Sequence, residues 1–370
     1  MNQEPSFKDY IIHNPGYSKL SEPIIKSASG SFLVDINGEK YFDPSLGAGS
    51  QILGHSNTQV ISTIQKKIMD GSIYLKNNIS LHAFCQRLKE VLPNSQRNYV
   101  FCNSGSEATQ RALRLARAAT GRDQIGYFSG GWHGINEWTM AEEGARFNLN
   151  SSSIHDGIPK FLKENSLLLP YNEEETFELI KKNSEQLACI IIEPVQGSNP
   201  RNDIVPFLKQ LQTICKSNGI LLIFDEIITG FRLGIGGATE LWTLKPDIVT
   251  YGKIIGGGLP VGLVTCTDKV AFNSFNNPDK KIHTGGTFSG NPLVSETGTA
   301  VISELVKLDY SLINDFGELL RNRLNLFFKE SSLPFSTIGT GSINRLAFTD
   351  KNGCATSYNS TASAPFRSIS

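Results

Sequence analysis

The stretch from Ile220 to Ile228, which reads ILLIFDEII, decides the fold class of this chain. Apart from two carboxylates it is continuously apolar, without the polar alternation of a half-exposed strand. Similar runs span Leu187–Val195 and Asp247–Tyr251, and Phe207–Ser217 has the spacing of a helix. Continuous apolar strands separated by helices indicate a parallel sheet that is covered on both faces. We therefore predict an α/β fold with a three-layer, mostly parallel sheet.

The flanking segments carry further local patterns. Residues 31–43 are expected to form a hairpin, because two strand-like runs flank Asn37-Gly38, a pair that suits a tight primed turn. Tyr99–Cys102 is a short apolar strand, and residues 106–120 have helical spacing. From Lys351 to Ser370 the chain is rich in Ser, Thr, Asn and Ala, which predicts loop or disorder.

Composition narrows the class of function. Of the 370 residues, 39% are hydrophobic, and 35 Lys plus Arg balance 35 Asp plus Glu, so neither nucleic acid nor a membrane surface is an expected partner. A secretory signal is not expected, because the first ten residues are polar. A transmembrane helix is not expected either, because the sequence has no run of eighteen apolar residues. The six cysteines include no Cys-x-x-Cys pair, which favours thiols in a reducing cytoplasm and predicts no metal site.

One candidate site is Asn103-Ser104-Gly105-Ser106-Glu107, which follows a strand and opens a helix. Gly105 allows close approach of backbone, Ser106 supplies a hydroxyl, and the free amides of a first helical turn attract an anion. The pattern suits a phosphate, although an ordinary helix cap made of Ser and Gly has the same sequence.

Two charged groups are expected at the same edge of the sheet, where open parallel sheets bind ligands. Asp225-Glu226 directly follows the apolar residues Leu221–Phe224, and such carboxylates are costly without a partner. They could protonate a ring nitrogen, bind a metal or cap a helix. Lys253 follows the next strand and precedes Gly256-Gly257-Gly258. Its amine could act as a nucleophile, or it could be a surface lysine beside a flexible loop.

Two glycine-rich segments complete the set. In Gly131-Trp132-His133-Gly134 the aromatic ring could stack on a planar ligand or could be buried at a turn. Thr284-Gly285-Gly286-Thr287 could close a second side of a phosphate site. Pyridoxal 5'-phosphate requires an anion-binding helix end, an aromatic side chain that stacks on its ring, a carboxylate and a lysine, and these motifs together offer all four.

In their residues and in their order along the chain, these motifs resemble the class III, fold-type I aminotransferases, and most closely their glutamate-1-semialdehyde 2,1-aminomutase branch. The likeness runs from about residue 23 to about residue 348. The motifs that carry it are Ile52–His55, Asn103–Ala108, Leu113–Arg117, Trp132–Gly134, Glu193–Val195, Asp225–Arg232, Gly252–Gly258 and His283–Pro292.

The resemblance implies a role for each matching residue. Lys253 would hold the cofactor as a Schiff base, and Asp225 would pair with its ring nitrogen; both would be catalytic. Trp132 and Ile227 would pack on the two ring faces, and Thr287 would reach the phosphate of the neighbouring subunit, so that a homodimer shares its sites. The full set of implied cofactor-binding residues is Ser104, Gly105, Ser106, Trp132, His133, Asp225, Ile227, Lys253 and Thr287.

The resemblance also implies a division of the chain. Residues 1–56 would form the N-terminal segment of the small domain, residues 57–300 the large cofactor-binding domain, and residues 301–370 a shortened C-terminal part of an α+β small domain. The implied function is an aminotransferase, with a small-molecule amine donor and carbonyl acceptor. A nicotinamide-dependent dehydrogenase is not expected, because no Gly-x-Gly-x-x-Gly opens a helix after an early strand.

Departures from the family pattern keep two alternatives open. Ile228 stands where many members of the family have Gln. The aminomutase branch also has an apolar residue at this position. Asn14–Leu20 lacks the arginine with which the aminomutase holds its substrate carboxylate, and Glu143–Phe147 replaces its mobile loop. Little likeness remains after Thr349. The alternatives are an intramolecular aminomutase and a shortened homologue that binds the cofactor without turnover.

Overall fold

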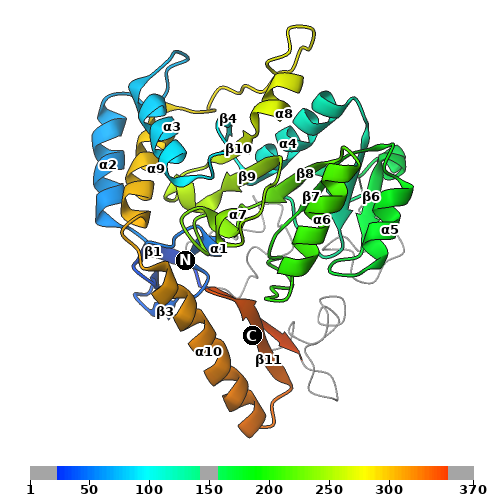
Figure 1. Ribbon diagram of the computed structural model, residues 1–370. Coiled ribbons are helices and arrows are strands. Elements are labelled where there is room, and N and C mark those ends of the chain that lie inside the picture. Colours follow the sequence, from blue (N-terminus) through cyan, green and yellow to red (C-terminus); the bar gives the residue numbers. More distant parts are fainter. Residues whose placement is uncertain (1–22, 142–156, 349–370) are drawn as a thin grey trace.

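The computed structural model describes residues 23–141 and 157–348 (Figure 1). The predicted features at Asn14–Leu20, Glu143–Phe147 and Lys351–Ser370 lie outside these residues. Within them, every helix is too short or too polar to cross a bilayer. The five described cysteines are free, and four of them are buried.

A seven-stranded sheet with the strand order β4-β10-β9-β8-β7-β5-β6 forms the centre of the molecule. Strand β10 pairs antiparallel with both β9 and β4, while the pairs from β9 to β6 are all parallel. The mostly parallel α/β sheet is therefore confirmed. Its strands are β4 (Asn98–Cys102), β5 (Gln124–Phe128), β6 (Ser166–Leu169), β7 (Leu187–Ile192), β8 (Leu221–Asp225), β9 (Ile248–Gly252) and β10 (Gly262–Cys266).

Helices cover both faces of this sheet, as continuous apolar strands require. Leu221 and Ile223 of β8 pack with α4 (Gly105–Thr120) and α8 (Asp268–Asn273) in one core. Leu222 and Phe224 point to the other face, where a second core forms. That face is covered by α2 (Thr58–Met69), α3 (Ile79–Val91), α5 (Glu175–Lys182), α6 (Val205–Ser217) and α9 (Pro292–Leu305).

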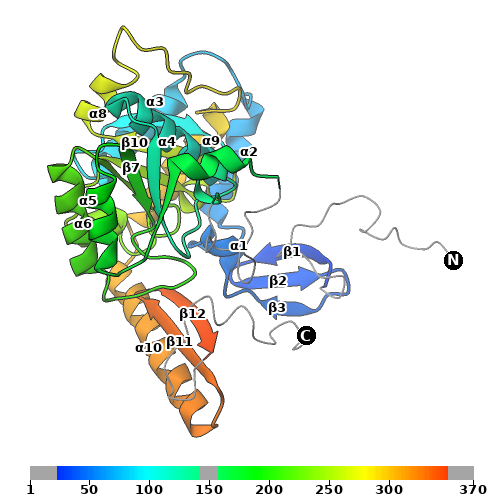
Figure 2. The ribbon, with the colours of Figure 1, turned by 90° about the vertical axis from the view of Figure 1, so that its right-hand side faces the viewer.

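Two smaller units lie at one end of the large sheet, where both views place them (Figures 1 and 2). An N-terminal antiparallel sheet contains β1 (Ile25–Ser29), β2 (Phe32–Asp35) and β3 (Lys40–Phe42). Near the C-terminus, α10 (Tyr310–Glu330) packs on the hairpin of β11 (Phe335–Thr340) and β12 (Ile343–Phe348). The remaining short helices are α1 (Leu46–Gly49), α7 (Gly237–Leu241), η2 (Glu137–Thr139), η3 (Lys160–Asn165) and η4 (Lys253–Gly256).

The predicted hairpin around Asn37-Gly38 is present, but its turn is of another type. The Asp35 N–H donates to the Glu39 carbonyl, and of the intervening residues only Gly38 has a positive φ, of 87°. A two-residue primed turn of the Asn-Gly type needs positive φ at both positions. The Asp35 carboxylate favours the longer loop because it accepts the N–H groups of Asn37 and Glu39, each at 2.9 Å.

Candidate active site

A cavity of about 180 Å³ lies at the carboxyl edge of the sheet. Trp132 reaches it from the segment after β5, Glu193 follows β7, Asp225 ends β8 and Lys253 follows β9. Ligands of open parallel sheets bind at this edge. The sequence motifs, which are spread over 149 positions from Gly105 to Lys253, therefore meet at one place. The lining residues are Gly105, Ser106, Trp132, Gly134, Glu193, Asp225, Ile227, Ile228 and Lys253.

The N-terminus of α4 closes one side of the cavity. The Ser104 hydroxyl caps the helix by accepting the Glu107 N–H at 3.2 Å, so Ser104 itself does not line the cavity. Gly105 and Ser106 do. A Cβ on Gly105 would stand 2.6 Å from the Ile227 Cδ1 atom, so glycine leaves room for the Ile227 side chain beside the helix end. The first-turn amides and the helix dipole make this end suitable for a phosphate.

The segment after β5 docks on the same helix end. Gly134 has a φ of 77°, and a Cβ there would stand 2.7 Å from the backbone Cα of Ser106. The Ser106 hydroxyl accepts the N–H of Ile135 at 3.1 Å. These contacts bring Trp132 beside the N-terminus of α4, and Trp132 is half-buried at the cavity wall.

Asp225 is 3% exposed, and its carboxylate receives several hydrogen bonds. Oδ1 accepts the Ile227 N–H at 3.2 Å and the Thr250 hydroxyl at 2.9 Å. Oδ2 lies 2.8 Å from Nδ1 of His133. A buried carboxylate needs such partners, and these hold it at the cavity with its charge available to a cationic ring.

His133 lies behind Asp225 rather than in the cavity wall. Its ring is 2% exposed, and its backbone carbonyl accepts the Thr109 hydroxyl at 2.7 Å. Nε2 is buried, and no described residue forms a hydrogen bond with it. Nδ1 is therefore the ring nitrogen that contacts the Asp225 carboxylate.

Lys253 begins η4 directly after β9 and faces the cavity that Asp225 lines. Its φ is 45°, an uncommon conformation for a residue that has a side chain. Gly257 and Gly258 follow with φ values of 56° and 98°. The backbone therefore turns sharply after the strand, and backbone strain of this kind is typical of functional sites.

Glu193 links two of the segments that surround the cavity. Its Oε1 accepts the Trp132 N–H at 2.7 Å, and its Oε2 accepts the Gly197 N–H at 3.2 Å. Burial raises the pKa of this carboxyl, and the neighbouring His133 acts in the opposite direction. Sequence reasoning left the role of Glu193 open; in the structure it holds the backbone of the aromatic segment in place.

Glu226, whose role the sequence also left open, points away from the cavity. It accepts the N–H groups of Ala238 at 2.7 Å and of Thr239 at 2.8 Å, at the start of α7. The Thr229 hydroxyl donates to it at 2.9 Å. The two neighbouring carboxylates therefore have different roles: Asp225 faces the cavity, and Glu226 stabilises a helix terminus.

Thr287 is exposed on the loop before α9 and does not line the cavity of its own chain. Arg111 of α4 holds this loop through the carbonyls of Thr284, at 2.5 Å, and of Gly285, at 3.2 Å. The structure therefore separates Thr287 from the other predicted site residues and presents it at the surface.

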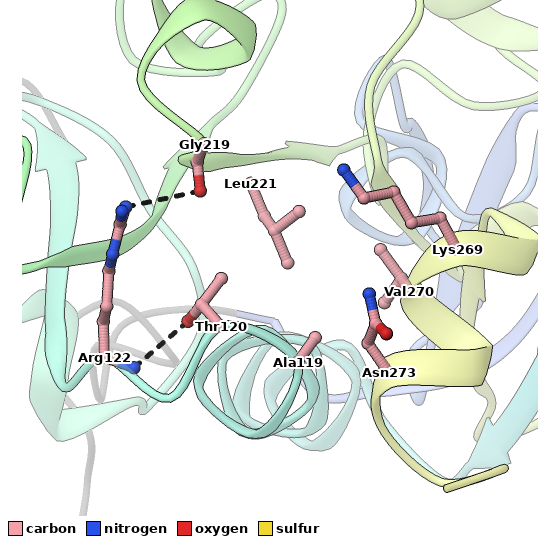
Figure 3. A pocket seen from close by; sticks show the side chains of 8 residues that line it. All are labelled: Ala119, Thr120, Arg122, Gly219, Leu221, Lys269, Val270 and Asn273. Carbon is pink, nitrogen blue, oxygen red and sulfur yellow. Dashed lines mark hydrogen bonds between the residues drawn. The ribbon is translucent and has the colours of Figure 1, made fainter.

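A second cavity, of about 160 Å³, lies between the end of α4, the start of β8 and α8 (Figure 3). Arg122 borders it, with Nη1 donating to the Gly219 carbonyl at 3.3 Å and the backbone N–H donating to the Thr120 hydroxyl at 3.3 Å. Leu221, the first residue of β8, also lines it, which places this cavity at the opposite edge of the sheet. It contains no predicted site residue.

The first cavity fits pyridoxal phosphate by its chemistry. A lysine amine, a hydrogen-bonded carboxylate, an aromatic side chain and a helix N-terminus line one space. These are the groups needed for covalent attachment, for a ring proton, for stacking and for a phosphate.

Comparison with known proteins agrees with this chemistry. Residues 13–351 match the family model described as aminotransferase class-III. The chain is 34% identical over 332 residues to glutamate-1-semialdehyde 2,1-aminomutase of Methanococcus maripaludis, covering 88% of this chain and 76% of the relative.

Solved structures show the same fold. An omega-transaminase from Sphaerobacter thermophilus superimposes with a TM-score of 0.83 at 28% identity, covering 93% of this chain and 80% of that one. A transaminase solved with pyridoxal phosphate bound gives a TM-score of 0.81 at 25% identity, covering 90% and 78%. The chain belongs to the class-III aminotransferase family of pyridoxal-phosphate-dependent enzymes.

Proposed function

We propose that this enzyme moves an amino group from a small-molecule amine to a small carbonyl acceptor, with Lys253 and Asp225 as its catalytic residues. The observation that carries the proposal is that both side chains line one cavity beside the N-terminus of α4. When bound, the cofactor supplies an electron sink for the carbanion chemistry of amino transfer.

The residues of the chain would divide the remaining tasks. The Lys253 amine attaches the cofactor and then, at Nζ, takes and returns the proton of the substrate carbon. Asp225 holds a proton on the ring nitrogen through its carboxylate. Trp132 and Ile227 pack on the ring, and the amides of Gly105 and Ser106 bind phosphate.

A second candidate function is the intramolecular transfer that converts glutamate-1-semialdehyde to 5-aminolevulinate. The relative from Methanococcus maripaludis, an aminomutase by name, favours it. Ile228 is consistent with it too, because this apolar side chain lines the cavity at the place where many class-III members have Gln.

We further propose a homodimer in which Thr287 serves the partner's site. Two observations support it. Thr287 is exposed beside Phe288, which is 55% exposed. Met69, at the end of α2, and Ile79, at the start of α3, are 85% and 82% exposed, and exposed apolar side chains of this size suit a subunit interface. The free cysteines are consistent with a cytoplasmic location.

For the domains, we propose a small one from the N-terminal sheet and the α10–β12 unit, and a large one between them. The expected boundary at residue 300 lies inside α9 (Pro292–Leu305). Because α9 packs on α2 and α3, we place the end of the large domain after Leu305.

The absorbance spectrum of purified protein tests the site, with wild type compared to Lys253→Ala before and after addition of a panel of amines. We expect a near-visible band in wild type that borohydride fixes to Lys253 and that one amine bleaches. A folded wild type that shows no such band when supplied with pyridoxal phosphate would refute the site assignment.

Supplying the semialdehyde alone separates the two candidate functions. Product formed without a second substrate supports the aminomutase. Absence of product in a preparation that completes a half-reaction with an amine supports transfer between two molecules.

A further inference from the structure

Thr250 contacts the carboxylate at the centre of the proposed site. It lies in the middle of β9 and is 0% exposed, and its Oγ1 donates to Oδ1 of Asp225 at 2.9 Å. Its backbone carbonyl also accepts the N–H of Glu226 at 2.9 Å. The side chain and main chain of one residue therefore hold the Asp225-Glu226 pair.

The sheet register explains why this contact is formed. Asp225 and Thr250 are paired residues on the parallel strands β8 and β9, so their side chains project from the same face. The hydroxyl is brought to the carboxylate by backbone hydrogen bonds that involve neither side chain. A hydroxyl at this position can restrict the carboxylate to one rotamer without further movement of the chain.

The donors around Asp225 come from different directions. The Ile227 N–H and the Thr250 hydroxyl donate to Oδ1, and His133 Nδ1 lies beside Oδ2. Hydrogen bonds to both oxygens from different directions fix the orientation of the carboxylate. Removing one donor from such a buried group is costly, because water does not replace it.

We propose that Thr250 is a positioning residue that orients the Asp225 carboxylate toward the ring nitrogen of the cofactor. This inference rests on the proposed role of Asp225. Because Lys253 follows three residues later in the chain, β9 would position both the attachment point of the cofactor and the partner of its ring nitrogen.

Thr250→Val tests the inference, because valine keeps the shape of threonine without the hydroxyl. We expect the dissociation constant for pyridoxal phosphate to rise by about tenfold or more, the effect of losing one hydrogen bond to a charged group. We also expect a changed visible spectrum of the bound cofactor. Thr250→Ser, which keeps the hydroxyl, should restore both. If the valine variant does not fold, Thr250→Ala removes the same hydroxyl and should give the same two changes.

Thr265→Val is the matched control. Thr265 is also 0% exposed in a neighbouring strand, and its hydroxyl donates to Gln96 Oε1 at 3.0 Å rather than to Asp225. We expect this variant to lose thermal stability in the apoprotein without a change in cofactor affinity or spectrum. A Thr250→Val affinity within about twofold of this control would overturn the proposal.

Asp225→Asn separates this proposal from the function on which it rests. If Thr250 acts through Asp225, Thr250→Val should not weaken cofactor binding further in the Asp225→Asn background. If Asp225→Asn weakens binding and Thr250→Val does not, the role of Thr250 alone is refuted. If Asp225→Asn has no effect on affinity or spectrum, the proposed role of Asp225 falls and that of Thr250 falls with it.

Discussion

Buried carboxylates in this protein are each surrounded by donors, and the donors decide what each carboxylate does. Asp225 faces the cavity, Glu193 holds backbone amides and Glu226 caps α7. Burial raises the pKa of Glu193 and of Glu226. Asp43 differs in the sign of its shift. Burial would raise its pKa, but hydrogen bonds from His55, Ser45 and backbone amides outweigh burial and lower the pKa to about 2.

Replacing Asp43 should therefore change the pH dependence of stability. Its pKa is about 2 in the folded protein, below the ordinary 3.8, so its contribution is present above about pH 4 and is lost as pH falls toward 2. We expect Asp43→Asn to lower the free energy of unfolding by about 2 kcal/mol at neutral pH, with a difference that shrinks in acid. Urea denaturation from pH 7 to pH 3 measures this.

Asp70→Asn provides the comparison for that experiment. The Asp70 side chain is 64% exposed and lies 3.8 Å from Lys67 Nζ, so it should behave as wild type across the range. A difference between Asp43→Asn and wild type that stays constant down to pH 3 would argue against an ionised Asp43 as the source of stability.

At the scale of elements, the site depends on how closely the segment after β5 packs on the end of α4. Gly134 makes that approach possible, since a side chain there would meet the backbone of Ser106. Gly121, at the other end of α4, has a similar positive φ of 72° but has nothing within 4 Å of the position a Cβ would take. The two glycines therefore separate the cost of backbone conformation from the cost of a steric clash.

We expect Gly134→Ala to displace Trp132 from the helix end and to weaken pyridoxal phosphate binding by about tenfold. Gly121→Ala should lose about 1 kcal/mol of stability through its positive φ, with unchanged cofactor affinity. Fluorescence titration with the cofactor and thermal unfolding of both variants measure the two effects. Equal cofactor affinity in both variants would show that the close approach at Gly134 is not needed for binding.

The whole molecule presents Thr287 at its surface instead of in its own cavity. If a partner subunit uses this residue, a site is complete only when two chains contribute to it. Arg111 would then serve the neighbouring site, because it fixes the loop that carries Thr287.

Mixing two inactive variants tests this sharing. Lys253→Ala removes the attachment point, and Thr287→Asp places a negative charge against the phosphate. In a mixed dimer, one site would receive its lysine from the second variant and its threonine from the first, and would be intact. We expect activity to appear on mixing after subunit exchange, although each variant alone is inactive. If Thr287 served its own chain, every site in the mixture would carry a defect and activity would not return.

Local sequence patterns were sufficient to predict the parallel sheet, the family and the cofactor. The apolar runs that became β7, β8 and β9 and the cap-and-glycine pattern of α4 depend on residues close together in the chain, so the parallel sheet and the start of the helix were predictable. The order of the motifs identified the family and the cofactor. Asp225 stood out because a carboxylate directly after a buried strand is costly unless it has a partner. Lys253 by itself resembled a surface lysine, and only its combination with the other motifs indicated a role.

Only the tertiary structure decided which groups surround these two residues. Thr250 resembles any β-branched residue of a strand, and its role depends on the register between β8 and β9. His133 reaches Asp225 from 92 positions earlier in the chain, and the helix start that Glu226 caps lies 12 positions later. The turn at Asn37 likewise followed the Asp35 side chain rather than the dipeptide. Hydrogen bonds between segments that are distant in the chain form only after the fold has brought both partners together. A local sequence pattern does not show which distant residues will become neighbours.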